Sequence, residues 1–172
     1  MFQIRFARPD DDFAAVAQLY LTAWRETYRP WLPATWLAKM TTAAWHPERS
    51  WRQTLLAFDD QQLVGVCAFG PARDEKFIGW GELRSIYLLA SVQHQGLGRD
   101  LLTQARATLQ QAGFSKVVLW VLAQNTPAQQ FYRRLGFRKT MTQKTQGIIH
   151  EVAYVWPADA PDVGSEESPQ FV

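Results

Sequence analysis

The chain has 172 residues, 47% of them hydrophobic and 13% aromatic, a composition that suits one folded domain and argues against a disordered or fibrous chain. No apolar run approaches the roughly 18 residues of a membrane-spanning helix, and the N-terminal stretch lacks the apolar core of a secretory signal. The single cysteine, Cys67, excludes an internal disulfide. We therefore expect a soluble, cytoplasmic protein with no membrane partner.

The formal net charge of +2 conceals an acidic C-terminal end. Residues 157–172 carry four acidic residues and no lysine or arginine, so removing those four negative charges leaves residues 1–156 at +6. A moderately basic domain suits a small anionic ligand, and without a long basic run we do not expect nucleic acid to be a partner. The Pro-, Ser- and acid-rich end predicts disorder, so we expect one domain over 1–156 and a disordered acidic tail over 157–172.

The N-terminal half begins with a strand and a helix. Residues 2–7 alternate in polarity, which predicts a strand, and an Asp cap precedes a helix over 13–27. The aromatic-rich stretch 28–51 is broken by three prolines and predicts short helices. Residues 54–58 and 63–70, on either side of a polar turn, predict a β-hairpin.

The C-terminal half continues the alternation of strands and helices. Its apolar periodicities predict a strand over 81–89, a helix over 96–113, a strand over 116–122, a helix over 126–136, and strands over 137–140 and 147–156. We expect Thr126 to cap the second of these helices, with Pro127 in its first turn. The order indicates an α/β (α+β) fold in which helices pack on a mixed sheet.

Two glycines two residues apart, Gly96 and Gly98, open the predicted helix over 96–113. A helix N-terminus presents unpaired N–H groups and the positive end of the helix dipole, and glycine lets a phosphate approach closely. The spacing excludes two phosphate loops, because neither the Gly-Lys-Ser/Thr of a P-loop nor the third glycine of a dinucleotide fingerprint follows. An ordinary turn before a helix is also compatible with two glycines.

The stretch "QHQGLG" (93–98), taken together with "NTPAQQFYRRLGF" (125–137), resembles the GNAT superfamily of acetyl-CoA-dependent N-acetyltransferases. The resemblance spans residues 81–137. It implies the GNAT-type fold, with a mixed, mostly antiparallel central sheet flanked by helices and two splayed strands forming the acyl-CoA cleft. It also implies acetyl-CoA as co-substrate and a primary amine as acceptor, and a homodimer is open as the oligomeric state because dimers are common in the family.

The same resemblance implies a set of cofactor-binding residues. The strand backbone at Ile86, Tyr87 and Leu88 would hold the pantetheine arm, and an amide near Leu88 would polarise the thioester carbonyl. The residues expected at the pyrophosphate or elsewhere on the cofactor are Gln93, His94, Gln95, Gly96, Leu97, Gly98, Arg99 and Asn125. His94 departs from the pattern, since many members carry Gly or Arg there. A core strand role for Ile86 and Leu88, a solvated Arg99 and a simple turn at Asn125 are the structural alternatives.

Two residues are the catalytic candidates that the resemblance implies. Tyr132 matches the tyrosine that protonates the departing thiolate, although a core aromatic is the structural alternative. An amine of pKa about 10.4 is neutral in only about one part in 2,500 at pH 7, so a proton acceptor is useful. Glu82 resembles the glutamate base of the histone-acetylating branch, and its alternative is a solvent-facing strand carboxylate. Other members place a glutamate at the position of Trp120, where this chain offers none.

Nucleophilic catalysis by a thiol is not expected. Cys67 lies in an apolar strand, which favours a core role, and the resemblance implies direct attack of the amine on the thioester. The three histidines show no metal-ligand spacing, and we expect no metal.

The acceptor pocket is expected in the aromatic-rich segment after the first helix. Trp24, Tyr28 and Trp31 are candidate substrate-binding residues, with Trp36 beside them, because aromatic faces attract ammonium groups. Packing of these rings on the sheet is the equally weighted alternative. Polyamines, amino-sugar antibiotics, amino acids and protein N-termini or lysines all remain open as acceptors. A non-catalytic acyl-CoA-binding regulatory module is the rival function.

Overall fold

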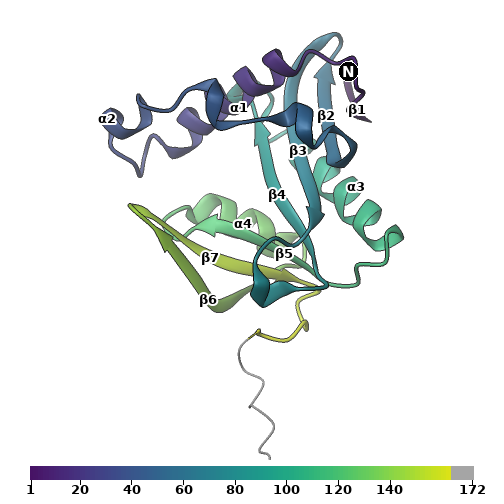
Figure 1. Ribbon diagram of the computed structural model, residues 1–172, viewed down its shortest axis with the longest axis vertical. Helices are drawn as coiled ribbons and strands as arrows, with labels where there is room; N and C mark the ends of the chain where they lie inside the picture. Colours follow the sequence, from purple (N-terminus) through teal and green to yellow (C-terminus); the bar gives the residue numbers. More distant parts are fainter. Residues whose placement is uncertain (164–172) are drawn as a thin grey trace, which may run out of the picture. The chain divides into compact units, whose positions relative to one another are not determined.

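The computed structural model describes residues 1–163, in which the chain forms two compact units (Figure 1). The first unit comprises residues 1–69 and 83–108, and the second comprises residues 70–82 and the chain from 109 onward. Hydrogen bonding orders the seven strands β1-β2-β3-β4-β5-β7-β6. The sheet is mixed and mostly antiparallel, as the sequence predicted, with the β1–β2, β2–β3, β5–β7 and β6–β7 pairs all antiparallel.

The elements follow the predicted order. The first half of the chain contains β1 (Phe2–Phe6), α1 (Phe13–Tyr28), α2 (Ala34–Leu37), the 3-10 helices η1 (Thr42–Ala44), η2 (Pro47–Arg49) and η3 (Trp51–Gln53), β2 (Thr54–Asp59), β3 (Gln62–Pro71) and η4 (Glu75–Phe77). The second half contains β4 (Gly81–Leu88), η5 (Ala90–Val92), α3 (Leu97–Gln111), β5 (Val117–Leu122), α4 (Thr126–Arg134), β6 (Arg138–Gln146) and β7 (Ile149–Trp156).

Short polar contacts fix the start of α1. The side chain of Asp12 accepts a hydrogen bond from the Ala15 N–H at 3.0 Å, which caps the helix. Asp11 forms a two-pronged ion pair with Arg5 of β1, at 2.6 and 2.9 Å. The Arg5 guanidinium thereby lowers the pKa of the Asp11 carboxyl. The helix is thus anchored to the first strand where the chain turns.

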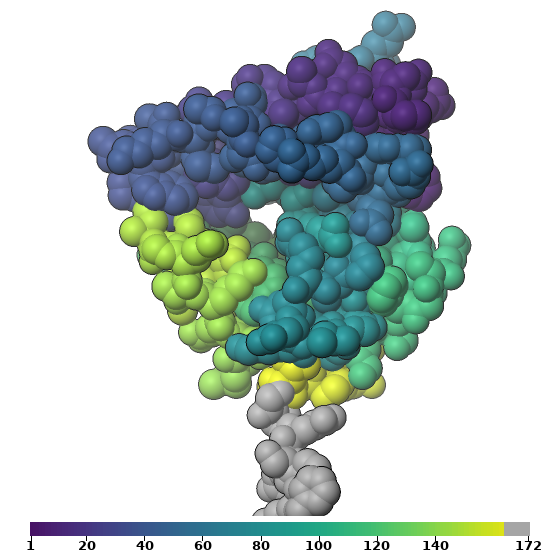
Figure 2. All heavy atoms as spheres, in the orientation of Figure 1, coloured from purple at the N-terminus to yellow at the C-terminus, as the bar shows by residue number. Residues whose placement is uncertain are grey.

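Each unit has its own apolar cluster. In the first, α1 buries Val16, Leu19 and Tyr20 against Leu56 of β2 and Val66 of β3. The chain between α1 and β2 lies at the surface of this unit (Figure 2). In the second unit, the cluster contains Phe77 and Trp80 together with the β5 and β7 residues Val118, Ala153 and Val155.

The structure differs from the predicted elements at two positions. The cap of α4 is Asn125, not Thr126, because the Asn125 side chain accepts a hydrogen bond from the Ala128 N–H at 3.1 Å and Thr126 is already helical. The last hairpin also begins with a longer strand than predicted, since β6 continues through the polar residues up to Gln146. Pairing with β7 satisfies their backbone groups, so polarity does not end the strand.

The ordered chain also continues past the boundary that composition placed at residue 156. Arg138 of β6 donates hydrogen bonds to the carbonyl oxygens of Ala158, at 2.6 Å, and of Ala160, and it pairs with the Asp162 carboxylate at 2.8 Å. Ala160 is buried. The first residues of the predicted tail are therefore fastened to the second unit, and the rest of that tail lies outside the described residues.

Candidate functional site

The predicted pyrophosphate loop lies directly before α3. His94 and Gly96 have positive φ angles, +61° and +86°. The Gly96 carbonyl accepts the first helical hydrogen bond, from the Asp100 N–H at 3.1 Å. The N–H groups of Leu97, Gly98 and Arg99 therefore precede the helical ladder, at the positive end of the helix dipole. Successive amides in turns of this kind, ahead of a helix, can converge on an anion.

Side chains at the ends of this loop hold its shape. The Gln93 amide donates to the Leu88 carbonyl oxygen at 3.1 Å, and the Gln95 amide donates to the Ser91 carbonyl oxygen at 3.1 Å. Gln93 thus joins the loop to the end of β4. This gives the first residue of the Q-x-x-G-x-G pattern a structural reason, because its side chain supports the loop and leaves the backbone amides for a ligand.

The end of β4 carries the three strand residues expected along the pantetheine arm. Ile86, Tyr87 and Leu88 are all half-buried. A Cβ placed on Gly65 of β3 would lie 2.5 Å from the Leu88 side chain and 3.5 Å from the Tyr87 carbonyl oxygen. A side chain at position 65 would therefore require the end of the Leu88 side chain to shift. Sequence reasoning missed this residue, whose only signal is a glycine inside an apolar strand.

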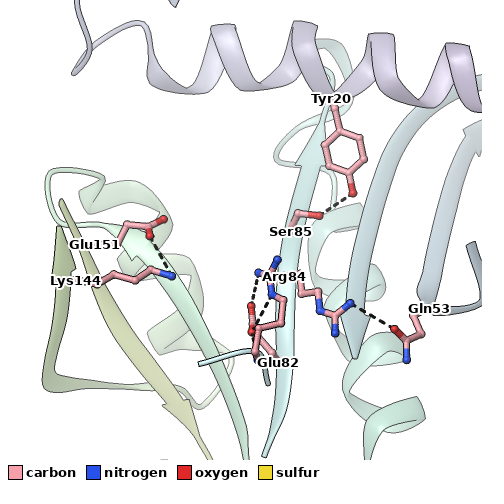
Figure 3. Close-up of polar contacts among 8 residues, drawn as sticks. Tyr20, Gln53, Glu82, Arg84, Ser85, Lys144 and Glu151 are labelled. Atoms are coloured by element: carbon pink, nitrogen blue, oxygen red, sulfur yellow. Dashed lines mark hydrogen bonds and ion pairs between the residues drawn. The ribbon is translucent and has the colours of Figure 1, made fainter. Parts of the chain in front are cut away.

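A row of contacting aromatic side chains connects β4 to α1 and the segment that follows it. Tyr20 stacks on Trp45 with ring centroids 5.8 Å apart and contacts Tyr87 edge-on at 5.7 Å. Its hydroxyl is 2.8 Å from that of Ser85 (Figure 3), and burial raises the pKa of Tyr20 to about 12. The Tyr28 and Tyr87 hydroxyls lie 3.4 Å apart. Tyr28 is therefore brought beside a predicted cofactor-binding residue.

The other acceptor candidates separate into packing and surface positions. Trp24 is only 9% exposed and contacts the rings of Tyr28, Trp36 and Trp45 at 5.2–6.0 Å, so it packs the segment together. Trp31 is half-buried. For Trp24 the contacts match the packing alternative, whereas Tyr28 and Trp31 keep accessible surface.

In the second unit, Asn125 and a buried amide hold α4 to the end of β5. The Gln129 side chain donates to the carbonyl oxygens of Leu122, at 3.3 Å, and Ala123, at 2.9 Å, and accepts from the Tyr154 hydroxyl at 2.9 Å. Asn125 is buried and uses Oδ1 as the helix cap. Neither Gln129 nor Tyr154 was singled out from the sequence, because their pairing joins a helix to a strand 25 residues away.

Tyr132 lies on α4, one turn after Gln129. It is half-buried, with its ring edge-on to Phe131 at 5.3 Å and to Phe137 at 6.1 Å. The helix that carries it is fixed at its first turn by the Asn125 cap and by Gln129. The position of the phenol is thus set by side chains that precede it by less than two turns.

Glu82, the candidate base, is buried and has strong partners. Its carboxylate accepts hydrogen bonds from Arg73, at 3.1 Å from the backbone N–H, 3.3 Å from Nε and 2.6 Å from Nη2. These contacts hold the turn after β3 against the start of β4. The carboxylate therefore has a structural role, and its use as a proton acceptor stays a prediction.

The predicted residues fall into two groups. The first unit contains the β4 backbone, the glycine loop and the aromatic acceptor candidates, and the second contains Glu82, Asn125 and Tyr132. Cys67 is fully buried in β3, and burial raises the pKa of its thiol, which fits a core residue. Within residues 1–163, no three His, Cys, Asp or Glu side chains gather as a metal site, and none of the described helices is long and apolar enough to cross a bilayer.

Comparison with known proteins places the chain in the GNAT class of acetyltransferases. Residues 16–137 match the acetyltransferase (GNAT) family, and the chain belongs to that family. It is an N-acetyltransferase by family membership. The chain is 32% identical over 154 residues to the uncharacterized N-acetyltransferase YuaI of Bacillus subtilis, and the match covers 86% of this chain and 88% of YuaI.

Solved structures share the fold. The PaiA N-acetyltransferase of Thermoplasma acidophilum, in complex with coenzyme A, has a TM-score of 0.70 at 20% identity, covering 89% of this chain and 98% of that one. YncA of Salmonella typhimurium, with its cofactor acetyl-CoA, has a TM-score of 0.69 at 24% identity, covering 94% and 98%. At these identities the likeness concerns the fold.

Proposed function

We propose that the protein transfers the acetyl group of acetyl-CoA to a primary amine by direct attack of the amine on the thioester. The observation that carries the proposal is the turn over 93–99. Its positive φ angles at His94 and Gly96 lead into three N–H groups that precede the helical ladder of α3. Such a turn is suited to a diphosphate, which is one of the anionic parts of coenzyme A.

The transfer step uses few groups of the chain. The amine nitrogen bonds to the carbonyl carbon, the C–S bond breaks, the nitrogen loses a proton, and the sulfur gains one. The Leu88 region would donate an N–H to the carbonyl oxygen as negative charge develops there. Tyr132 would donate its hydroxyl proton to the departing sulfur, and its position on a helix fixed by Gln129 supports this role.

A covalent acetyl-enzyme on cysteine finds no support in this chain. Cys67 is fully buried in β3, and burial raises the pKa of its thiol, so the reactive thiolate is disfavoured. Glu82 already has a structural role, because its carboxylate accepts three hydrogen bonds from Arg73. Its use as the proton acceptor is therefore the part of the proposal that needs the sharpest test.

Thiol release from acetyl-CoA with a panel of amines tests the proposal. We expect turnover with at least one amine, and we expect Tyr132→Phe to lower kcat by about 100-fold while the KM for acetyl-CoA changes little, since the ring packing is kept. Phe131→Tyr, on the neighbouring residue, is a control for changes to this helix. Tight binding of acetyl-CoA without turnover on any amine would instead favour the regulatory module.

A further inference from the structure

Three residues on neighbouring strands of the second unit form a charged and aromatic cluster that the proposed function does not use. They are Trp120 on β5, Lys144 on β6 and Glu151 on β7, and we call them the ammonium cluster. Lys144 Nζ lies 4.1 Å from the centroid of the Trp120 ring. It also lies 3.5 Å from Glu151 Oε2, and Figure 3 shows this ion pair. One ammonium group thus contacts both an aromatic face and a carboxylate.

The strand register places all three side chains on one face. Lys144 pairs with Glu151, and Glu151 pairs with Leu122, two residues from Trp120. Paired residues and residues two apart point to the same side of a sheet. The Lys144 side chain therefore extends from the edge strand across β7 to reach β5.

That face is the one that α4 does not cover. Tyr154 is an odd number of residues from Glu151 on β7, so it points to the opposite side, where its hydroxyl bonds Gln129 of α4. The cluster is also accessible, because the Lys144 side chain is 44% exposed and that of Glu151 is 24% exposed. A long, flexible lysine at an open position can leave its contacts without unpacking the core.

The contacts match the chemistry that recognises an alkylammonium ion. An indole face attracts a cation through its quadrupole, and a carboxylate adds a charged hydrogen-bond acceptor. Both stabilise the protonated amine. A site of this kind does not suit the reacting nitrogen, which must lose its proton, but it suits a second ammonium that stays charged throughout the reaction.

We infer that Trp120 and Glu151 bind a second, non-reacting ammonium group of the acceptor, and that Lys144 fills this place until the acceptor arrives. This inference rests on the proposed function and narrows its acceptor to diamines, polyamines and other amines that carry a second cation. It assigns Lys144 the role of an internal competitor, so its removal improves binding.

The test compares cadaverine with pentylamine, which has the same carbon chain and lacks the second ammonium. We expect Glu151→Gln to raise the KM for cadaverine, relative to that for pentylamine, by about tenfold, and Trp120→Leu to raise the same ratio by about threefold to tenfold. Lys144→Met should lower the KM for cadaverine by about threefold. Lys139→Met is the matched control, because Lys139 lies on the same strand but pairs with Tyr154 on the opposite face, and it should leave the ratio unchanged.

Calorimetry with cadaverine, in the presence of coenzyme A, gives a readout that does not need turnover. Weaker binding by Glu151→Gln and tighter binding by Lys144→Met support the site even if no amine releases thiol, a result that would count only against the proposed function. Unchanged affinity in both variants, or a loss of affinity in Lys144→Met, would show that the cluster is merely a surface ion pair. Melting temperatures of all variants identify any that fail to fold.

Discussion

The two units differ in the groups that they offer to a ligand. In the first, the turn over 93–99 offers backbone N–H groups, and the side chains of Gln93 and Gln95 only support the loop. In the second, the candidate groups are side chains that already have partners, as with Glu82 on Arg73 and Asn125 on the first turn of α4. A backbone site is defined by conformation and by glycine, whereas a side-chain site depends on which polar atoms are already used.

The largest effect is expected in the loop over 93–99, where backbone N–H groups are predicted to bind the diphosphate. Gly96→Asp puts a carboxylate next to the amides of the loop, where it repels a diphosphate and competes for its donors. We expect the Kd for coenzyme A, measured by calorimetry, to rise by about 100-fold or more.

Gly79→Asp is a closely matched control for that change. Gly79 has the same φ, +86°, and, as at Gly96, an added Cβ would meet open space, so the backbone strain and the added charge are equal in the two variants. Equal losses of affinity in both variants would contradict the placement of the diphosphate at the loop.

An intermediate effect is expected at the buried carboxylate of Glu82, which pairs with Arg73 in the second unit. Glu82→Gln keeps the shape but removes the charge that Arg73 neutralises, so the free energy of unfolding should fall by about 2 kcal/mol in a denaturant titration. Use of Glu82 as proton acceptor adds a separate effect, a fall in kcat of about 100-fold. Arg73→Met is the matched variant, since it breaks the same pair and leaves the carboxylate. If Glu82→Gln loses stability but keeps its kcat, the prediction that Glu82 is the proton acceptor is wrong.

The smallest effect is expected at Asn125, where two variants separate helix capping from contact with coenzyme A. Asn125 caps α4 through Oδ1, so Asn125→Ala should lower the free energy of unfolding by about 1 kcal/mol. Asn125→Asp keeps the cap and the favourable charge at a helix N-terminus but loses the Nδ2 donor. We expect its stability to match the wild type and its Kd for coenzyme A to rise by about fivefold. An unchanged Kd would mean that Asn125 is a cap alone.

Local patterns predicted most of the fold. Within residues 1–163, local patterns located every long helix and every strand apart from most of β6, and the Asp12 cap of α1 needed only the neighbouring residues. The errors arose where several residues compete for one role. Asn125 and Thr126 are both good caps, and the structure uses Asn125. Similarly, the polar sequence of β6 hides a strand whose backbone pairs with β7.

The sequence by itself determined the family, the order of elements and the position of the glycine turn before α3, because these depend on spacing along the chain and on where glycine frees the backbone. Tertiary structure decided what the side chains do. It placed Arg73 on Glu82, Gln129 between β5 and Tyr154, and the ammonium of Lys144 on Trp120 and Glu151. Partners far apart in sequence are chosen by strand register and helix packing, and the chemistry of a polar side chain depends on those partners.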